Sequence, residues 1–472
     1  MDKNKMKIVK TTVTKQNQLL IKNKMKMRNY FKSALLASAF IVGFASCSND
    51  DEIGGADLGD AVQTMVQVAI TQSGPATYAG SATATTEESA VNKVELYIFN
   101  KSKVLEAVEK TTFATGTAET MKFKLTKGIH YFYAAINAPD NLLTSEQKAI
   151  GVTLDSFKKN LTKAFEEGEL NNPANGFFMT NVTNEPVLAD LVETEDPQDN
   201  DVQISVGRAM AKVNVAFKPE SQGVLGKLSN VQYKVHNNPI KMYFMPFYES
   251  GVLQTPFFTD EVGEDGSGTI TSANYFPNLQ YSGEQENTDK YLKEDFEKSF
   301  VSYAIENSNA VPREGNSTFL MIRGTYTPAK TFDGNGENEI LDVNGNTTGD
   351  SFWRIKATDG TFTDKFYRDK PTTTVADGGL AFKYENGLSY YALWVGDNSI
   401  EKNPTAKYTV KRNNFYKVTI TSVSGPGANT ENGKDEGEEG VTDPKEELDA
   451  KTQIQATITV LPWTVIDQSG GI

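Results

Sequence analysis

Alternation of apolar and polar residues with a period of two recurs along this chain, and this pattern limits its fold more than any other feature. Such runs predict half-buried β-strands, because successive side chains of a strand point to opposite faces of its sheet. Gly, Asn, Asp and Pro bound the runs, and many of their residues are β-branched or aromatic. The predicted strands cover residues 62–70, 93–99, 129–137, 202–206, 211–217, 231–235, 318–326, 390–395, 415–423 and 453–465. The chain is therefore expected to be mostly β.

The first predicted strand has a clear inward face, and helical signals are few. The residues on that face are Val62, Thr64, Val66, Val68 and Ile70. The best helical segment is 142–167, in which Thr144 and Gln147 have the spacing of a capping box. Phe157, Leu161, Ala164 and Phe165 form an apolar stripe there. We expect few and short helices.

The N-terminus resembles an export signal that ends in a lipid attachment site. Residues 1–46 contain ten Lys or Arg and one acid, and the apolar run 34–45 is shorter than the roughly 20 residues that span a bilayer. The run is followed by Cys47, the chain's single cysteine, and residues 44–47 (FASC) resemble a bacterial lipobox. We predict a signal peptide over 1–46 and lipidation of Cys47. An ordinary signal peptide with a free thiol remains the alternative, and translation beginning near Met25 or Met27 would shorten the leader.

Charge and length then define the exported part. From Cys47 onward, 37 Lys or Arg face 60 acids, a formal charge of about −23. Such a surface repels nucleic acid and anionic lipid. We expect a flexible acidic tether over 47–60, an N-terminal domain over 61–205 and a C-terminal domain over 206–472. Residues 333–350 and 425–451 are predicted surface loops.

The terminal strand, 453–466, is unusual for its position and its apolar residues. Ile454, Ala456, Ile458 and Val460 alternate with polar residues, and Pro462 interrupts the run. Proline cannot donate a ladder hydrogen bond, which favours an edge, a bulge or two short strands. Such a strand either pairs within its own sheet or, after a long loop, reaches another molecule.

Residues suited to catalysis or metal binding are scarce. The two histidines, His130 and His236, lie in separate predicted domains and are expected to be structural. No nucleophile elbow and no phosphate-binding loop is found, so we expect no catalytic residue, no metal and no cofactor. A carboxylate pair of the glycosidase type is not excluded. Residues 333–340 lack the spacing of a calcium loop, and Trp353 and Trp394 are expected to pack in a core rather than to stack on sugars.

Several segments resemble the major-subunit family of the short fimbriae of Bacteroidales, within the wider fimbrillin superfamily. They are 87–99 (EESAVNKVELYIF), 207–215 (GRAMAKVNV), 233–239 (YKVHNNP), 413–420 (NNFYKVTI) and 459–465 (TVLPWTV). The resemblance implies a type V pilus subunit, exported as a lipoprotein and built from two tandem β-sandwich domains of transthyretin-like topology.

The resemblance also implies assembly by strand exchange. A protease would remove the first strand, and the C-terminal strand of a neighbouring subunit would fill the vacated groove. The expected pocket-filling donor residues are Ile454, Ile458, Val460, Trp463 and Val465, and the displaced strand carries Val62 to Ile70. Processing in the family follows Arg or Lys, yet no basic residue lies between Cys47 and Lys93, including the loop 73–80. A protease of other specificity would act there, or the first strand stays in place.

Two functions follow as expectations. The first is a structural subunit of a surface fimbrium that polymerises by strand exchange and supports adhesion. The second is a non-polymerising surface lipoprotein that acts as a fimbrial anchor, a tip adhesin or a glycan-binding module. The expected partners are other copies of the chain, accessory subunits, and host or bacterial receptors. The lipid on Cys47 would attach the precursor to the outer membrane before processing.

Overall fold

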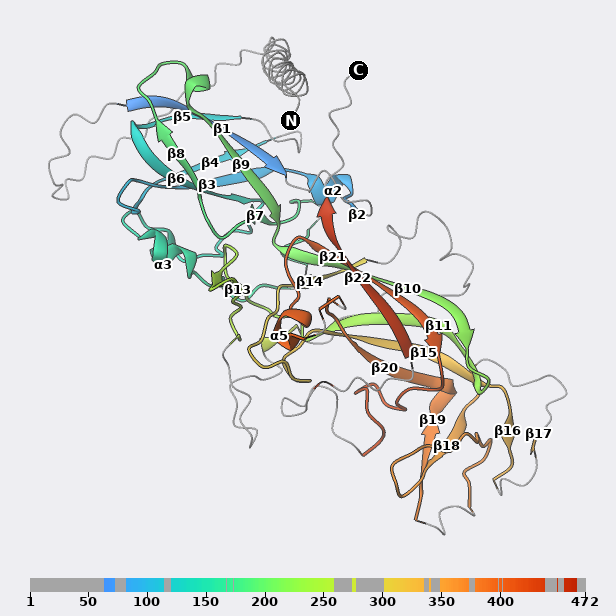
Figure 1. Cartoon of the computed structure of the whole chain (residues 1–472). Helices are drawn as coiled ribbons and strands as arrows, with labels where there is room; N and C mark the ends of the chain where they lie inside the picture. The colour runs from blue at the N-terminus through green and yellow to red at the C-terminus, as the bar shows by residue number, and fades with distance from the viewer. Residues whose placement is uncertain are drawn as a thin grey trace, which may run out of the picture. The chain divides into compact units, whose positions relative to one another are not determined.

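The computed structural model describes residues 63–72, 82–113, 120–166, 168–172, 174–258, 274–276, 301–334, 339–340, 349–372, 378–397, 399–400, 402–437, 448 and 454–464 (Figure 1). These residues belong to one compact unit, Ala61–Ile472. The protein is mostly β, as the alternating pattern predicted. Each of the ten predicted strands corresponds to a strand in the structure, with ends that differ by a few residues.

The N-terminal part forms one eight-stranded sheet. Its order is β4 (Leu105–Thr112), β3 (Lys93–Phe99), β6 (Gly128–Ile136), β7 (Met179–Asn181), β9 (Asp201–Arg208), β1 (Gln63–Gln72) and β5 (Met121–Thr126), with β8 (Val187–Leu191) also paired to β6. The buried faces of these strands enclose one hydrophobic cluster, which includes Leu96, Phe132 and Ile204. This cluster also takes in Phe244 and Phe415 from later in the chain, so packing continues across the sequence boundary expected near residue 205.

The C-terminal part contains two larger sheets that share a second hydrophobic cluster. One has the order β14 (Val301–Ile305), β10 (Met210–Gln222), β21 (Asn414–Val423), β22 (Ile454–Thr464) and β2 (Ala82–Thr83). The other has the order β11 (Gly226–His236), β15 (Phe319–Pro328) and β20 (Leu388–Trp394). Val213, Val418, Tyr233 and Ile322 meet between them, so the inward faces of both sheets pack on each other. The chain passes from the first sheet to the second at Ala209, between β9 and β10.

Short strand pairs complete this part. They are β12 (Tyr248–Glu249) with β13 (Val252–Leu253), β16 (Thr331–Phe332) with β17 (Glu339–Ile340), and β18 (Phe352–Lys356) with β19 (Leu380–Tyr384). Trp394 is buried, which agrees with the core packing expected for it, whereas Trp353 is only half-buried; Phe352 and Tyr390 are buried as well.

The helical segment expected over 142–167 forms only in part. The segment contains one 3₁₀ turn, η1 (Glu146–Lys148), and one short helix, α3 (Leu154–Lys158). Thr144 and Gln147 do exchange the reciprocal hydrogen bonds of a capping box, at 2.8 and 3.3 Å. The helix does not continue, because Gly151 has a positive φ of 98°. Beyond α3 the backbone instead pairs with residues 240–244, as when the Phe165 N–H donates to the Ile240 carbonyl at 3.0 Å.

The remaining helices are as short as predicted. They are α2 (Thr86–Ser89) and α5 (Pro404–Lys407), with the 3₁₀ segments η2 (Pro197–Asn200) and η6 (Glu385–Gly387). Within the described residues, no helix is long and apolar enough to cross a membrane. The predicted signal segment, Cys47 and the tether lie outside the described residues.

Candidate functional site

The first strand, β1, lies between two strands that are distant from it in sequence. It pairs antiparallel with β5, for example Gln67 with Lys122, and parallel with β9, for example Val68 with Val202. Its predicted inward face is buried: the exposed fractions of Thr64, Val66, Val68 and Ile70 are 1%, 0%, 0% and 6%. Val62 lies outside the described residues.

The neighbours of β1 would line a groove in its absence. Val202, Ile204 and Val206 of β9, with Met121 and Leu125 of β5, belong to the same hydrophobic cluster as the buried face of β1. Both neighbouring strands would lose a partner along one edge, which would leave their ladder groups and these apolar side chains available to another strand.

Near its start, β1 carries the buried Thr64 hydroxyl, and every hydrogen-bonding site of this hydroxyl has a partner. Thr64 Oγ1 donates to the Val192 carbonyl at 2.6 Å and accepts from the Thr194 N–H at 3.1 Å and from Asn200 Nδ2 at 3.0 Å. Asn200 is 4% exposed, and its amide also donates to the Met65 carbonyl at 2.9 Å. A hydroxyl has one donor and two acceptor sites, and all three are used here.

The chain after β1 is held on the C-terminal part. Residues 73–81, which include the loop where processing is expected, lie outside the described residues. β2 then pairs parallel with the end of β22, Ala82 opposite Trp463 and Thr83 opposite Thr464. Helix α2 follows directly and begins with a capping box between Thr85 and Glu88.

Glu88 of this helix lies in a buried cluster of charges. Its carboxylate pairs with Lys212 Nζ of β10 at 3.1 Å, and both side chains are 2% exposed. The Tyr303 hydroxyl donates to Glu88 Oε1 at 2.8 Å, and Arg208 Nε donates to the Glu88 carbonyl at 2.8 Å. Burial raises the pKa of Tyr303, with a further contribution from the Glu88 carboxylate. Burial lowers the pKa of Arg208 to about 10. This cluster fixes α2 to β10 and β14.

The terminal strand β22 lies in its own chain's sheet. It pairs antiparallel with β21 from Asn414 opposite Pro462 to Val423 opposite Ile454, and its end lies beside β2 (Figure 1). Ile458 is 6% exposed and packs in the second hydrophobic cluster. The predicted donor residues Ile454, Val460 and Trp463 are on this strand, but their side chains, and the whole of Val465, lie outside the described part.

The loop that precedes β22 differs from the freely solvated loop expected over 425–451. Its described portion makes three ion pairs with the C-terminal part. Lys234 pairs with Glu431 at 2.7 Å, Lys356 with Asp435 at 3.1 Å, and Lys434 with Glu314 at 3.2 Å. Glu431 and Asp435, which lie in the predicted surface loop, therefore pair with lysines on β11 and β18.

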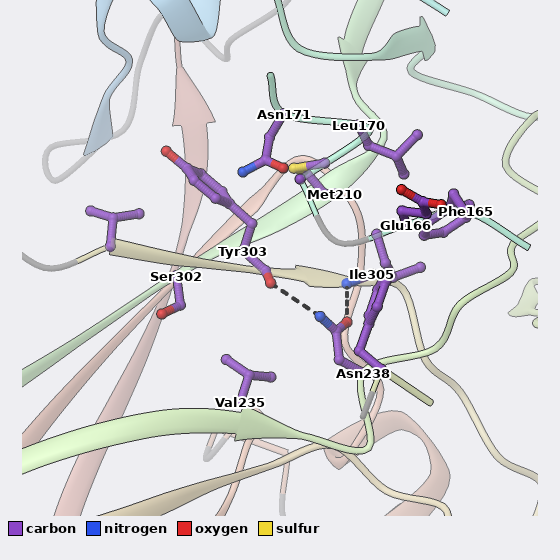
Figure 2. Close-up of a pocket in the computed structure, with 13 residues that line it drawn as sticks. Phe165, Glu166, Leu170, Asn171, Met210, Val235, Asn238, Ser302, Tyr303 and Ile305 are labelled. Atoms are coloured by element: carbon purple, nitrogen blue, oxygen red, sulfur yellow. Dashed lines mark hydrogen bonds between the residues drawn. The ribbon is translucent and has the colours of Figure 1, made fainter. Parts of the chain in front are cut away.

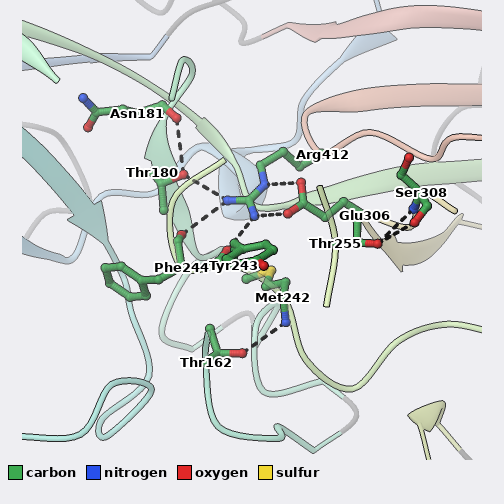
Figure 3. Close-up of polar contacts among 10 residues, drawn as sticks. All are labelled: Thr162, Thr180, Asn181, Met242, Tyr243, Phe244, Thr255, Glu306, Ser308 and Arg412. Carbon is green, nitrogen blue, oxygen red and sulfur yellow. Dashed lines mark hydrogen bonds and ion pairs between the residues drawn. The ribbon is translucent and has the colours of Figure 1, made fainter. Parts of the chain in front are cut away.

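A second buried ion pair joins segments from both parts of the chain (Figure 3). Arg412 Nε donates to Glu306 Oε2 at 2.7 Å, and Arg412 Nη2 pairs with Glu306 Oε1; the two side chains are 8% and 0% exposed. The same guanidinium donates to the Tyr243 carbonyl at 2.7 Å and, at 3.4 Å each, to the Phe244 carbonyl and the Thr180 hydroxyl of β7. Arg412 thereby connects the N-terminal sheet to the segments that flank β11, β14 and β21.

A pocket of about 250 Å³ lies beside the Glu88 cluster (Figure 2). Phe165 and Leu170 line it from the N-terminal part, and Met210, Val235 and Ile305 line it from the C-terminal part. The Asn238 side chain reaches into this region, but its amide is used by the backbone of β14: Oδ1 accepts from the Ile305 N–H at 2.7 Å, and Nδ2 donates to the Tyr303 carbonyl at 3.3 Å.

The two histidines have structural surroundings, as expected. His130 is 2% exposed and lies 2.8 Å from Glu106 Oε1 through Nε2 and 2.9 Å from the Gly128 carbonyl through Nδ1. Burial lowers its pKa, but these partners outweigh burial, so the net pKa is raised. His236 stacks on Phe319 with ring centroids 4.8 Å apart, and burial lowers its pKa to about 4. Within the described ranges, no group of three or more His, Cys, Asp or Glu is placed to hold a metal ion.

Sequence reasoning found the two strands but missed the polar groups around them. Asn200, Lys212 and Arg412 were not singled out. Thr85 and Glu88 have the spacing of a capping box, and this local pattern could have indicated the start of helix α2.

Comparison with known proteins gives two family matches that cover both strands. Residues 64–207 match the model "Major fimbrial subunit protein (FimA)", and residues 382–469 match the model "Major fimbrial subunit protein type IV, Fimbrillin, C-terminal". The first match begins within β1, and the second ends beyond β22.

Individual relatives are distant. The chain is 26% identical over 116 residues to the minor fimbrium subunit Mfa1 of Porphyromonas gingivalis, a match to 23% of this chain and 21% of that protein. Among solved structures, a fimbrilin (fimA) of Porphyromonas gingivalis has a TM-score of 0.47 at 14% identity, over 86% of this chain and 99% of that one. The tip fimbrial protein Mfa3 of the same species, with a C-terminal truncation, has a TM-score of 0.42 at 12% identity, over 85% and 100%. With TM-scores below 0.5, neither likeness adds to the assignment.

Proposed function

The chain belongs to the family of Bacteroidales major fimbrial subunit proteins, and from this membership we propose that it is a structural subunit of a surface fimbrium that polymerises by strand exchange. The family consists of structural and adhesion proteins, and the chain is not an enzyme. The observation that carries the proposal is the position of β1: a first strand buried between β5 and β9 and followed in sequence by the loop 73–80, where processing is expected.

The burial of β1 gives a driving force for its replacement. Val66, Val68 and Ile70 are at most 6% exposed, and burying such a side chain contributes about 1.5–3 kcal/mol. Insertion of another strand with three apolar side chains at alternate positions would therefore be favourable by several kcal/mol. The ladder hydrogen bonds would add to this free energy. A donor from one copy and an acceptor groove on the next are different surfaces, so the contact is head-to-tail and propagates as a filament.

The proposed donor is β22, with Ile454, Ile458, Val460, Trp463 and Val465 as the side chains that enter the groove. Its release has a cost, because Ile458 packs in its own core and the strand pairs along β21. Exchange is favourable only if insertion into the groove of the next subunit stabilises β22 at least as much as its own sheet does. One matched family segment, 64–207, contains the strand to be displaced, and the other, 382–469, contains the proposed donor strand, which supports this pairing of roles.

One observation favours a second function. Residues 48–92 contain no Arg or Lys, so a protease that cuts after basic residues has no site before β3. If β1 is never removed, the groove stays filled, and the chain acts at a filament end as an anchor or tip adhesin, or as a separate glycan-binding lipoprotein. In either case we place it at the cell surface, exported as a lipoprotein through Cys47, with other fimbrial subunits as partners.

N-terminal sequencing of this chain in purified fimbriae separates the two functions. A start within or after residues 73–80 is expected for a polymerising subunit. Fimbriae that contain only the form beginning at acylated Cys47, or that lack the chain altogether, would contradict polymerisation by removal of β1.

A reversible disulfide tests whether β1 has to leave. Gln67 and Lys122 are directly opposite each other on β1 and β5, with side chains toward the outer face. The double variant Q67C/K122C should hold β1 in place after proteolysis and prevent filament growth until a reductant is added. Each single cysteine variant is the matched control and should polymerise with or without reductant. Equal filament growth by the oxidised double variant would exclude exchange at this groove.

Truncation of the terminal strand tests the donor. Deletion of 461–472 keeps Ile458 in its own core but removes Trp463 and Val465, so we expect a folded monomer that does not polymerise. Deletion of 467–472 is the control, because it leaves the predicted donor intact. If both truncated proteins form filaments, the donor lies elsewhere.

A further inference from the structure

The partners of Thr64 form a hydroxyl site at one end of the groove. We define this site as the Asn200 side-chain amide, the Thr194 N–H and the Val192 carbonyl, which contact Thr64 Oγ1 at 3.0, 3.1 and 2.6 Å. Thr64 and Asn200 are 1% and 4% exposed, so the hydrogen bond between their side chains is buried while β1 is in place. The other buried positions of the strand are apolar.

This site constrains whatever replaces β1. An apolar side chain at the Thr64 position would leave the half-buried Thr194 N–H without this acceptor and remove one of three acceptors of the Asn200 amide, which also donates to the Met65 and Val192 carbonyls at 2.9 and 2.8 Å. Sliding the strand by one residue would turn every side chain to the opposite face. A slide by two residues would place an apolar residue in the hydroxyl site. The site therefore favours one register, in which a serine or threonine accepts from the Thr194 N–H.

The terminal strand offers one alternating set that matches the groove in both polarity and size. Read from Thr64 to Ile70, the buried face of β1 is Thr, Val, Val, Ile. Read backwards from Thr464 to Ile458, alternate residues of β22 are Thr, Pro, Val, Ile: Thr464, Pro462, Val460 and Ile458. Three of the four residue types are identical, and proline replaces valine at the remaining position.

A forward reading fits less well. Beginning at Thr459, alternate residues are Thr, Leu, Trp and Val, which places Trp463 where β1 has Val68. Val68 is 0% exposed, and an indole in the space of an isopropyl group overpacks a core. Pro462 removes one ladder hydrogen bond in either reading, so it does not separate them.

From this match, and on the basis of the proposed function, we propose that the hydroxyl site receives Thr464 of a second copy of this chain and so sets the register and direction of the donor strand. The incoming β22 then runs opposite to β1, parallel to β5 and antiparallel to β9. Thr464 takes the place of Thr64, Val460 that of Val68, and Ile458 that of Ile70. This register narrows the donor set proposed above: Ile458 and Val460 enter the groove, whereas Trp463 and Val465 lie on the opposite face of the strand.

A displacement assay tests this register in the folded subunit. A sequence-specific protease site is placed within residues 73–80 of the exported chain, and cleavage leaves a fluorescently labelled β1 segment bound without a covalent link. A synthetic peptide of residues 453–472 is then added, and loss of the labelled segment is measured. We expect the T464V peptide to displace it about 5- to 100-fold less effectively than the unaltered peptide. The T464S peptide, which keeps the hydroxyl, should be nearly as effective as the unaltered one.

The outcomes separate the register from strand exchange itself. If the unaltered peptide does not displace the labelled segment, strand exchange at this groove fails, and the inference fails with it. If the unaltered and T464V peptides displace it equally, exchange stands and the hydroxyl site does not set the register. If the T459V peptide displaces the labelled segment poorly and the T464V peptide displaces it normally, the proposed strand direction is wrong.

The acceptor side has its own test in the same cleaved subunit. In a T64V subunit the labelled segment should dissociate about 5- to 100-fold faster, because the hydroxyl site loses its occupant, while T64S should restore slow release. Equal release from all three subunits would show that the site does not hold the strand.

Discussion

The ion pair between Arg412 and Glu306 leads to a sharp prediction for the variant R412M. The substitution removes the guanidinium but keeps an unbranched side chain of similar length. Glu306 is 0% exposed and would remain as a buried carboxylate with no cation beside it. The Tyr243 carbonyl, which accepts from Arg412 Nη2 at 2.7 Å, would lose that donor as well.

The expected cost follows from this burial. Removal of one partner from a buried ion pair destabilises a protein by about 3–5 kcal/mol, mainly because the other charge stays buried. At a denaturant slope of about 3 kcal/mol per molar urea, the unfolding midpoint should fall by about 1–1.7 M. The double variant R412M/E306L removes both charges, and it should recover most of this loss.

Urea unfolding of the exported chain, followed by tryptophan fluorescence, measures these shifts. K158M is the matched control, since Lys158 pairs with Glu185 at 2.7 Å but Glu185 is 66% exposed. An exposed pair contributes at most about 1 kcal/mol. If R412M costs no more than K158M, or if the double variant is as unstable as R412M, the buried pair does not have the role described here.

Three further predictions concern neighbouring groups. K212M removes a cation from beside the buried Glu88 carboxylate and should destabilise the chain by about 3–5 kcal/mol in the same urea assay. I458A should cost about 2–5 kcal/mol if β22 packs in its own core in the monomer, and a cost below 1 kcal/mol would contradict that packing. The pKa of His236 is lowered to about 4, so stability should be constant at neutral pH and fall as the pH decreases from about 6.5 toward 4; H236F should flatten this part of the pH profile.

Strand positions could be predicted from the sequence because burial of one face requires period-two alternation. The buried face of β1, Thr64 to Ile70, was read correctly from this pattern alone. β4, Leu105–Thr112, was missed because only Leu105 is fully buried there, so its sequence has no apolar alternation to detect. The helical segment expected over 142–167 forms only two short pieces, because the backbone of residues 162–165 pairs with residues 240–242, which local propensity does not show.

The polar contacts were beyond sequence reasoning for a different reason. Asn200 lies 136 residues from Thr64, and Arg412 lies 106 residues from Glu306. Such pairs have no fixed spacing, and a single Asn or Arg in a polar segment is indistinguishable from a solvated one. Their partners become definite only when β1 is inserted between β5 and β9 and when β10 is paired with β21, and both arrangements depend on long-range topology.

The charge clusters lie on the part of the chain that strand exchange would leave in place. If residues up to the loop 73–81 are removed, the new N-terminal segment begins at β2 and α2. Glu88 of α2 is held by Lys212 and Tyr303, and none of these contacts involves β1. The loss of β1 would therefore open the groove without releasing α2 from β10. β2 would also remain beside the end of β22, so the departure of β22 as a donor has to break this parallel pair as well as the ladder with β21. Each step therefore breaks two ladders: β1 has to leave β5 and β9, and β22 has to leave β21 and β2.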